Sequence, residues 1–248
     1  MVYVEAGKTS FENGWVEVEN DFYINKYSVT QSEFEDVMGF NPSYYINNPN
    51  NPVETVTWYD AVLFCNRLNE REDLEPYYNI GYIEYFNEEA ILGGHPNNIK
   101  SARVTENPQA NGYRLPTREE HEYAARGGYD GLPTTYAGCD DLNKVGWYWS
   151  NSGDNWLKIY TDYGAILNNN NQTKPVGQKQ PNELGLSDMS GNVWNYTNTF
   201  NGDFIYKRGG SYQYYSEVYS IGAVGYDTLT SLSDRYHYEG FSIARSHN

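Results

Sequence analysis

The chain has 248 residues, and 17 Lys and Arg against 33 Asp and Glu give a formal net charge of −16. A chain of this length can bury a core without disulfides or a structural metal. The acidic balance disfavours binding to nucleic acid or to an anionic membrane surface, because both need clusters of Lys and Arg, and no apolar run approaches the ~20 residues that would cross a bilayer.

Three N-terminal capping signals predict three helices. Thr30, Thr57 and Thr117 are each followed three residues later by Glu or Asp, which is the spacing of a capping box. Apolar residues follow each signal at helical spacing, and the third helix is expected to end at Gly127–Gly128. Cys65 falls on the apolar stripe of the second helix, so we expect a buried structural thiol there.

Strands and loops are expected in the remainder of the chain. Val2–Val4 and Phe22–Ile24 are short apolar runs, and residues 140–248 show no helical period. Within them, residues 155–173 have the composition of an inserted loop. We predict a single α+β domain that covers residues 1–248.

Chemistry-bearing side chains are few. Cys65 and Cys139 form at most one bridge and fit no zinc or redox spacing, and the four histidines are scattered along the chain. His121 lies on the third predicted helix, where we expect it to pack and not to react. We predict no catalytic residue, no metal site and no cofactor.

The tyrosine content is unusually high, with 26 Tyr against 9 Phe and 6 Trp. A buried tyrosine hydroxyl needs a hydrogen-bond partner, so a surplus of this size is more typical of a contact surface than of a core. Tyr supplies a rigid, amphipathic contact area at low entropic cost.

Several phrases, taken in order, resemble the formylglycine-generating enzyme (sulfatase-modifying factor) domain over nearly the whole chain. They include Pro52–Ala61 (PVETVTWYDA), Tyr113–Thr117 (YRLPT), Asp188–Trp194 (DMSGNVW), Arg208–Ser211 (RGGS) and Gly240–Arg245 (GFSIAR). The resemblance implies a C-type-lectin-type fold with two main helices, small twisted sheets and many ordered loops. Arg114, Arg126, Arg208 and Arg245 are expected to be structural cations.

Departures from that family argue against its enzymatic activity. The oxidase members use paired cysteines after the Arg-Gly-Gly-Ser phrase, and this chain has no cysteine after Cys139. The alternative is a formylglycine-generating-enzyme-like oxidase, or another sulfatase-modifying enzyme, that uses a site without cysteine.

Enzymatic relatives also bind calcium near the Gly-Asn-Val-Trp phrase. The resemblance places the ligands at the Asp188 side chain, the carbonyls of Gly191 and Val193, and position 195. That position is Asn195 here instead of the usual Glu, one charge fewer for a hard cation. The sequence pairs of calcium-dependent sugar-binding lectins are not present, although a calcium-dependent sugar binder stays open as a third class.

The region that replaces the active site resembles the variable proteins of diversity-generating retroelements, and is most like the Treponema member of that group. Adenine-directed mutagenesis diversifies the binding face of those proteins, and residues 195–245 would be the variable region here. From Gly209 to Tyr238 there is no Lys, Met or Trp, which is consistent with such mutagenesis, and Gln213 and Glu217 would have to be fixed positions. The predicted contact residues are Asn195, Tyr196, Tyr212, Tyr214, Tyr215, Tyr219, Ala223, Tyr226, Asp227, Thr228, Leu229, Tyr236, His237 and Tyr238.

These observations predict a non-catalytic ligand-binding protein with a diversified, Tyr-rich face. The expected partner is a protein or another cell-surface ligand, with no role for nucleic acid. By resemblance we expect a monomer at the cell surface, as an outer-membrane lipoprotein whose leader and lipid anchor belong to the native precursor.

Overall fold

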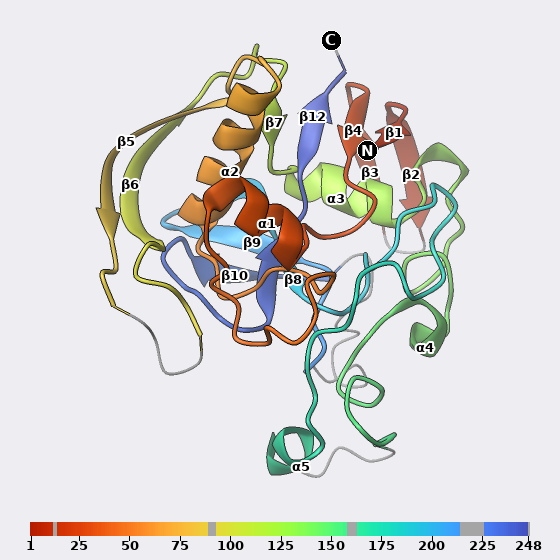
Figure 1. Cartoon of the computed structure of the whole chain (residues 1–248). Helices are drawn as coiled ribbons and strands as arrows, with labels where there is room; N and C mark the ends of the chain where they lie inside the picture. The colour runs from red at the N-terminus through yellow and green to blue at the C-terminus, as the bar shows by residue number, and fades with distance from the viewer. Residues whose placement is uncertain (12–13, 89–92, 158–162, 214–225, 248) are drawn as a thin grey trace.

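The computed structural model describes residues 1–248 except residues 12–13, 89–92, 158–162, 214–225 and 248 (Figure 1). The described residues form helices, small sheets and long connecting loops. This arrangement confirms the predicted α+β fold class.

Each of the three longer helices starts at a capping box, as the sequence predicts. Helix α1 covers Gln31–Met38, helix α2 covers Trp58–Arg71 and helix α3 covers Arg118–Ala125. The hydroxyl of the capping threonine accepts from the backbone N–H three residues on, and the acidic side chain there accepts from the threonine N–H. These paired bonds satisfy N–H groups that the first helical turn leaves free.

One four-stranded antiparallel sheet joins the two ends of the chain. Its order is β1 (Val2–Val4), β4 (Phe22–Ile24), β12 (Ala244–Ser246) and β7 (Tyr113–Arg114). Strands β1 and β12 therefore place both termini at the same end of the molecule (Figure 1).

A second four-stranded sheet has the order β10 (Asp227–Ser231), β9 (Phe204–Arg208), β8 (Trp194–Asn201) and β11 (Glu239–Phe241). Strand β11 runs parallel to β8, whereas the other pairs are antiparallel. Strand β8 is central, and its first four residues are buried.

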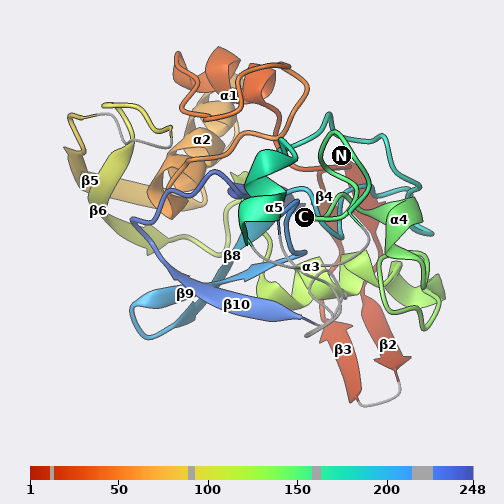
Figure 2. The ribbon, with the colours of Figure 1, turned by 90° about the horizontal axis from the view of Figure 1, so that it is seen from below.

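Two hairpins and several short helices complete the described elements. The hairpins are β2 (Gly7–Phe11) with β3 (Gly14–Val18), which projects from the body in Figure 2, and β5 (Tyr78–Tyr85) with β6 (Ile99–Glu106). The short helices are a 3₁₀ turn at Gly128–Asp130, α4 (Leu142–Val145) and α5 (Tyr163–Asn168).

Helices α4 and α5 fall where the sequence predicts no helix, and α5 lies inside the predicted loop at residues 155–173. Each is less than two turns long, too short to produce a helical period in the sequence. Among the described residues, no helix has both the length and the apolar character to cross a membrane.

The larger apolar core is built on helix α2. The ring of Phe64 lies 5.8 Å from the ring of Phe34 and 5.3 Å from the ring of Phe241 at the end of β11. Burial of each such side chain contributes roughly 1.5–3 kcal/mol. Cys65 is fully buried beside them, as predicted, and burial raises the pKa of its thiol, so the reactive thiolate is suppressed.

The arginines act as the predicted structural cations. Arg114 donates two parallel bonds to Glu120, of 2.7 and 2.6 Å, and so joins β7 to helix α3. Arg126 and Arg208 both pair with Glu122, at 2.8 and 2.9 Å.

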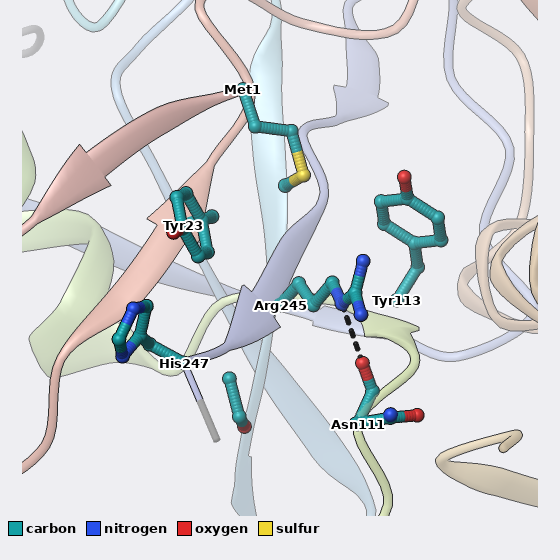
Figure 3. Close-up of a pocket in the computed structure, with 7 residues that line it drawn as sticks. Met1, Tyr23, Asn111, Tyr113, Arg245 and His247 are labelled. Atoms are coloured by element: carbon teal, nitrogen blue, oxygen red, sulfur yellow. Dashed lines mark hydrogen bonds between the residues drawn. The ribbon is translucent and has the colours of Figure 1, made fainter. Parts of the chain in front are cut away.

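Arg245, the fourth of these arginines, lines a cavity of about 430 Å³ beside the two termini (Figure 3). Its Nε donates to the carbonyl of Asn111 at 2.6 Å. The predicted structural role is therefore confirmed for Arg245 as well.

His121 on helix α3 is buried, and neither ring nitrogen has a hydrogen-bond partner. Burial, with a smaller effect from the nearby Arg208, lowers the pKa of His121 to about 3. The imidazole thus packs as a neutral ring, which agrees with its predicted packing role.

Replacing His121 tests this assignment through the pH dependence of stability. The folded-state pKa lies below the unfolded value of 6.5, so the unfolded chain takes up the proton first as pH falls. The stability of wild type relative to His121→Leu should therefore fall by ~1.4 kcal/mol per pH unit below about pH 6.5. Urea unfolding of both proteins between about pH 4 and 8 measures this difference, and parallel pH profiles would contradict it.

Candidate binding face

A buried ion pair lies beneath the C-terminal tyrosines. Lys207 on β9 pairs with Glu239 on β11, with the residues 5% and 0% exposed. The Tyr196 hydroxyl donates to the other oxygen of Glu239 at 3.0 Å, and Thr230 on β10 bonds the same carboxylate at 3.4 Å. Burial raises the pKa of Glu239, while Lys207 opposes that shift. All four strands of this sheet therefore meet at one carboxylate.

Above this pair lies a stacked tyrosine pair. The rings of Tyr236 and Tyr238 are 5.1 Å apart and within 4° of parallel, and Tyr236 is 43% exposed. The Lys207 ammonium lies 5.6 Å from the Tyr238 ring, on the protein side of the pair. The stacked rings of Tyr236 and Tyr238 thus lie next to the buried pair of Lys207 and Glu239.

Strand β10 and Tyr226, the residue before it, present other predicted contact residues at intermediate or high exposure. Tyr226, Asp227 and Thr228 are half-buried, and Leu229 is exposed. The Asp227 carboxylate already pairs with Arg118 and with Arg208, the latter at 3.0 Å, so it serves the scaffold. Tyr226, Thr228 and Leu229 have side chains that reach the surface.

Asn195 and Tyr196 were predicted to be contact residues, and their burial contradicts that placement. Both lie at the start of the central strand β8, where they are 2% and 0% exposed. The Tyr196 hydroxyl donates inward, to the carbonyl of Val56 and to Glu239. Sequence composition cannot distinguish such a tyrosine from an exposed one, because the partners of its hydroxyl come from distant segments.

Tyr212 and His237 were also predicted to be exposed, and this is wrong. The Tyr212 hydroxyl lies 2.5 Å from Nδ1 of His237 and 3.3 Å from the hydroxyl of Tyr45, and both predicted residues are buried. Burial lowers the pKa of His237. These two side chains support the surface from beneath. Tyr214, Tyr215, Tyr219 and Ala223 lie outside the described residues.

The predicted set omitted Tyr44 and Tyr45, which meet the C-terminal segment from the loop after α1. The ring of Tyr44 lies 5.7 Å from that of His237, and the ring of Tyr45 lies 5.7 Å from that of Tyr212. The backbone N–H groups of Tyr44 and Tyr45 donate to the buried Glu54 carboxylate at 3.1 and 2.8 Å. Burial raises the pKa of Glu54 to about 7.

The residues at the position of the relatives' calcium site do not fit a calcium ion. The amide of Asn195 donates to the Val193 carbonyl at 3.1 Å, and its oxygen accepts from Ser28 at 2.9 Å. Asp188 accepts from the Gly177 N–H at 2.6 Å and offers one further oxygen without a hydrogen bond. Calcium takes about six to eight oxygen ligands, whereas here an N–H group faces a carbonyl that the ion would need.

The cysteines and the possible metal ligands were also located in the described residues. Cys65 and Cys139 are unpaired, and Cys139 is half-buried and accepts from the Asp141 N–H at 3.4 Å. The described ranges contain no group of three or more His, Cys, Asp and Glu side chains spaced to hold a metal.

Comparisons with known proteins agree with this fold over the whole chain. The family model for the sulfatase-modifying factor enzyme 1-like domain matches residues 1–246. Among solved structures, Treponema denticola variable protein 1 superposes with a TM-score of 0.76 and 25% identity, covering 100% of this chain and 95% of that one. The predicted resemblance to both groups is confirmed.

Two curated relatives carry different names. A Paenibacillus barcinonensis protein named chaperone protein LppX is 47% identical over 198 residues, which are 78% of this chain and 69% of the relative. The formylglycine-generating enzyme of Mycobacterium tuberculosis is 42% identical over 88 residues, which are 36% of this chain and 27% of the enzyme.

Breaking the buried pair should destabilise the sheet beneath the stacked tyrosines. Lys207→Ala leaves Glu239 buried without its cation, which should cost ~3 kcal/mol or more. The control is Lys100→Ala, since Lys100 forms an exposed pair with Glu84 and its loss should leave the unfolding midpoint within error. Urea unfolding measures both.

The double variant Lys207→Met with Glu239→Gln completes that experiment. It removes both charges together and should recover part of the loss. Equal effects of Lys207→Ala and Lys100→Ala would contradict the assigned role of the pair.

Proposed function

The chain belongs to the family of sulfatase-modifying factor enzyme 1-like domains, and we propose that within this family it is a non-catalytic protein that binds another polypeptide. The observation that carries the proposal is the stacked pair Tyr236 and Tyr238, which lies beside a buried ion pair whose carboxylate also accepts from Tyr196. The whole-chain similarity to a variable protein supports a binding role. The chaperone name of a 47% identical relative supports a polypeptide partner.

The proposed mechanism separates support from contact. Lys207 and Glu239 fix the sheet, so exposed side chains can change without loss of the fold. Aromatic anchors provide most of the affinity in such interfaces, and small polar side chains adapt to the partner. Because the support is formed before binding, little ordering entropy is lost on association.

We further propose that the face is diversified by a retroelement. Its variable region would lie within residues 195–245, with variation concentrated at the positions whose side chains reach the surface. Buried positions such as Tyr196 and Tyr212 should tolerate little change, because their hydroxyls serve partners inside the protein. Display on the cell surface by a lipid anchor is part of the same proposal.

The enzymatic alternative is less well supported by this chain's own side chains. The oxidase chemistry of the family needs an activated thiolate, and burial raises the pKa of the Cys65 thiol. Cys139 precedes the Arg-Gly-Gly-Ser phrase at Arg208–Ser211, whereas the paired cysteines of the oxidases follow that phrase.

The first test is truncation of the stacked pair. The probes are dodecapeptides selected from a phage-displayed random library for binding to the wild-type protein. Fluorescence anisotropy measures the affinity of each peptide for wild type and for the variants. Tyr236→Ala and Tyr238→Ala should each weaken binding by more than ~1 kcal/mol with little change in Tm. Tyr82→Ala, at a residue 86% exposed on β5, is the matched control. If each variant loses stability as well as affinity, these residues belong to the core, and the proposal that they contact the ligand is refuted.

The second test concerns the gene. About 500 bases downstream of the stop codon should contain a near-copy of the codons for residues 195–245 beside a reverse transcriptase. This copy should differ from the gene only where it carries adenines, and the differences should cluster at codons for exposed residues. A locus without such a copy would refute diversification and leave the binding proposal to the first test.

A further inference from the structure

Two segments without charge lie next to each other in a strongly acidic protein. Residues 37–53 and residues 163–173 contain no Asp, Glu, Lys or Arg, although 20% of the chain is charged. They are in direct contact, because the Tyr45 hydroxyl donates to the Asn171 carbonyl and the Asn51 amide donates to the Thr173 carbonyl, both at 3.2 Å. Both segments lie on the side of the molecule seen in Figure 2, where α5 faces the reader.

A continuous row of rings connects this uncharged region to the stacked tyrosines. From Tyr44 the row passes to His237 at 5.7 Å, to Tyr238 at 5.2 Å and to Tyr236 at 5.1 Å. Its two outer members, Tyr44 and Tyr236, are both 43% exposed. The neighbouring Ile46 is 71% exposed, so this end of the row also presents an aliphatic side chain.

The loop that carries Tyr44 and Ile46 is fixed in place. Glu54 accepts the N–H groups of Tyr44 and Tyr45 from below, and the Asn51 amide ties the end of the loop to residue 173. Glu54 is completely buried, so its carboxylate adds no charge to the surface. The loop backbone is therefore already ordered before binding, which removes that part of the entropy cost of association.

From these contacts we propose that Tyr44 and Ile46 form a second, fixed half of the binding face, and that the partner is a protein with an uncharged, apolar patch. This inference rests on the proposed function and adds the chemistry of the partner. The centres of protein interfaces are depleted of charge and enriched in aromatic residues, as this region is. A charged partner group would lose its hydration against residues 37–53 and find no counter-charge on them, whereas residues 163–173 have the exposed Asp154 carboxylate beside them, where it accepts from Asn170.

The exposed aliphatic side chain of Ile46 favours a protein over a neutral glycan as the partner that binds this region. Sugars pack their faces against aromatic rings, whereas a branched aliphatic side chain such as Ile46 buries its surface best against other apolar side chains. The 47% identical relative named as a chaperone points to the same class of partner.

The test uses the same dodecapeptide probes and the full chain. Ile46→Asp and Tyr44→Ala should each weaken binding about tenfold or more without a change in Tm. The matched controls are Leu132→Asp, at an aliphatic residue 56% exposed after the 3₁₀ turn, and Tyr82→Ala. The contribution of Tyr44 and Ile46 to the affinity, taken as the ratio of wild type to Tyr44→Ala or Ile46→Asp, should change less than about threefold between about 50 and 500 mM NaCl, because residues 37–53 have no charge for salt to screen. An array of neutral oligosaccharides, probed with the same proteins, is the competing arm.

The outcomes separate this inference from the proposed function. If Tyr236→Ala weakens binding but Ile46→Asp and Tyr44→Ala do not, the function stands and the fixed half is refuted. A ratio that falls steeply with salt would refute the uncharged partner patch. Oligosaccharide binding that Tyr44→Ala abolishes and Ile46→Asp leaves intact would replace the protein partner with a glycan. If no variant affects peptide binding, the proposed function fails as well.

Discussion

The ion pair between Lys207 and Glu239 is the constraint on which the rest of this region depends. Desolvation of two charges costs several kcal/mol per ion, so such a pair is stable only when every remaining polar atom is satisfied. Tyr196 and Thr230 satisfy the carboxylate from two other strands, which fixes the register of all four. The segment after β10 returns to the sheet as β11, which pairs with β8, and on the way it leaves Tyr236 exposed and Tyr238 half-buried.

The elements predicted from sequence are those set by local chemistry. The helix starts at Thr30, Thr57 and Thr117 could be predicted because a capping box needs only four consecutive residues. The burial of Tyr196 could not be predicted in this way, since its hydroxyl meets Val56 and Glu239, which are 140 and 43 positions away. The same reason explains Tyr212, whose surroundings depend on residues 45 and 237.

The loop at residues 44–46 shows a different limit of sequence reasoning. The absence of charge in this loop is visible in the sequence. It indicates an uncharged surface region only once the structure shows that residues 163–173, which are also uncharged, contact the loop. Abundant tyrosine near the C-terminus directs attention to one segment, whereas the described surface is made by that segment together with a loop nearly two hundred positions earlier. A search for uncharged runs would have returned residues 37–53 and 163–173, but also residues 189–202, so contact between segments is needed to select among them.

On the proposed function, this chain uses for binding a fold that some named relatives use for catalysis. At position 195 the resemblance implies a Glu that helps to hold calcium; Asn195 instead donates to the Val193 carbonyl and accepts from Ser28. The amide N–H of Asn195 thus contacts the carbonyl that a calcium ion would bind, and the amide oxygen accepts a hydrogen bond in place of a contact with the ion. Strand β8, which contains Asn195, is held in its buried position by these hydrogen bonds together with the burial of Trp194 and Tyr196.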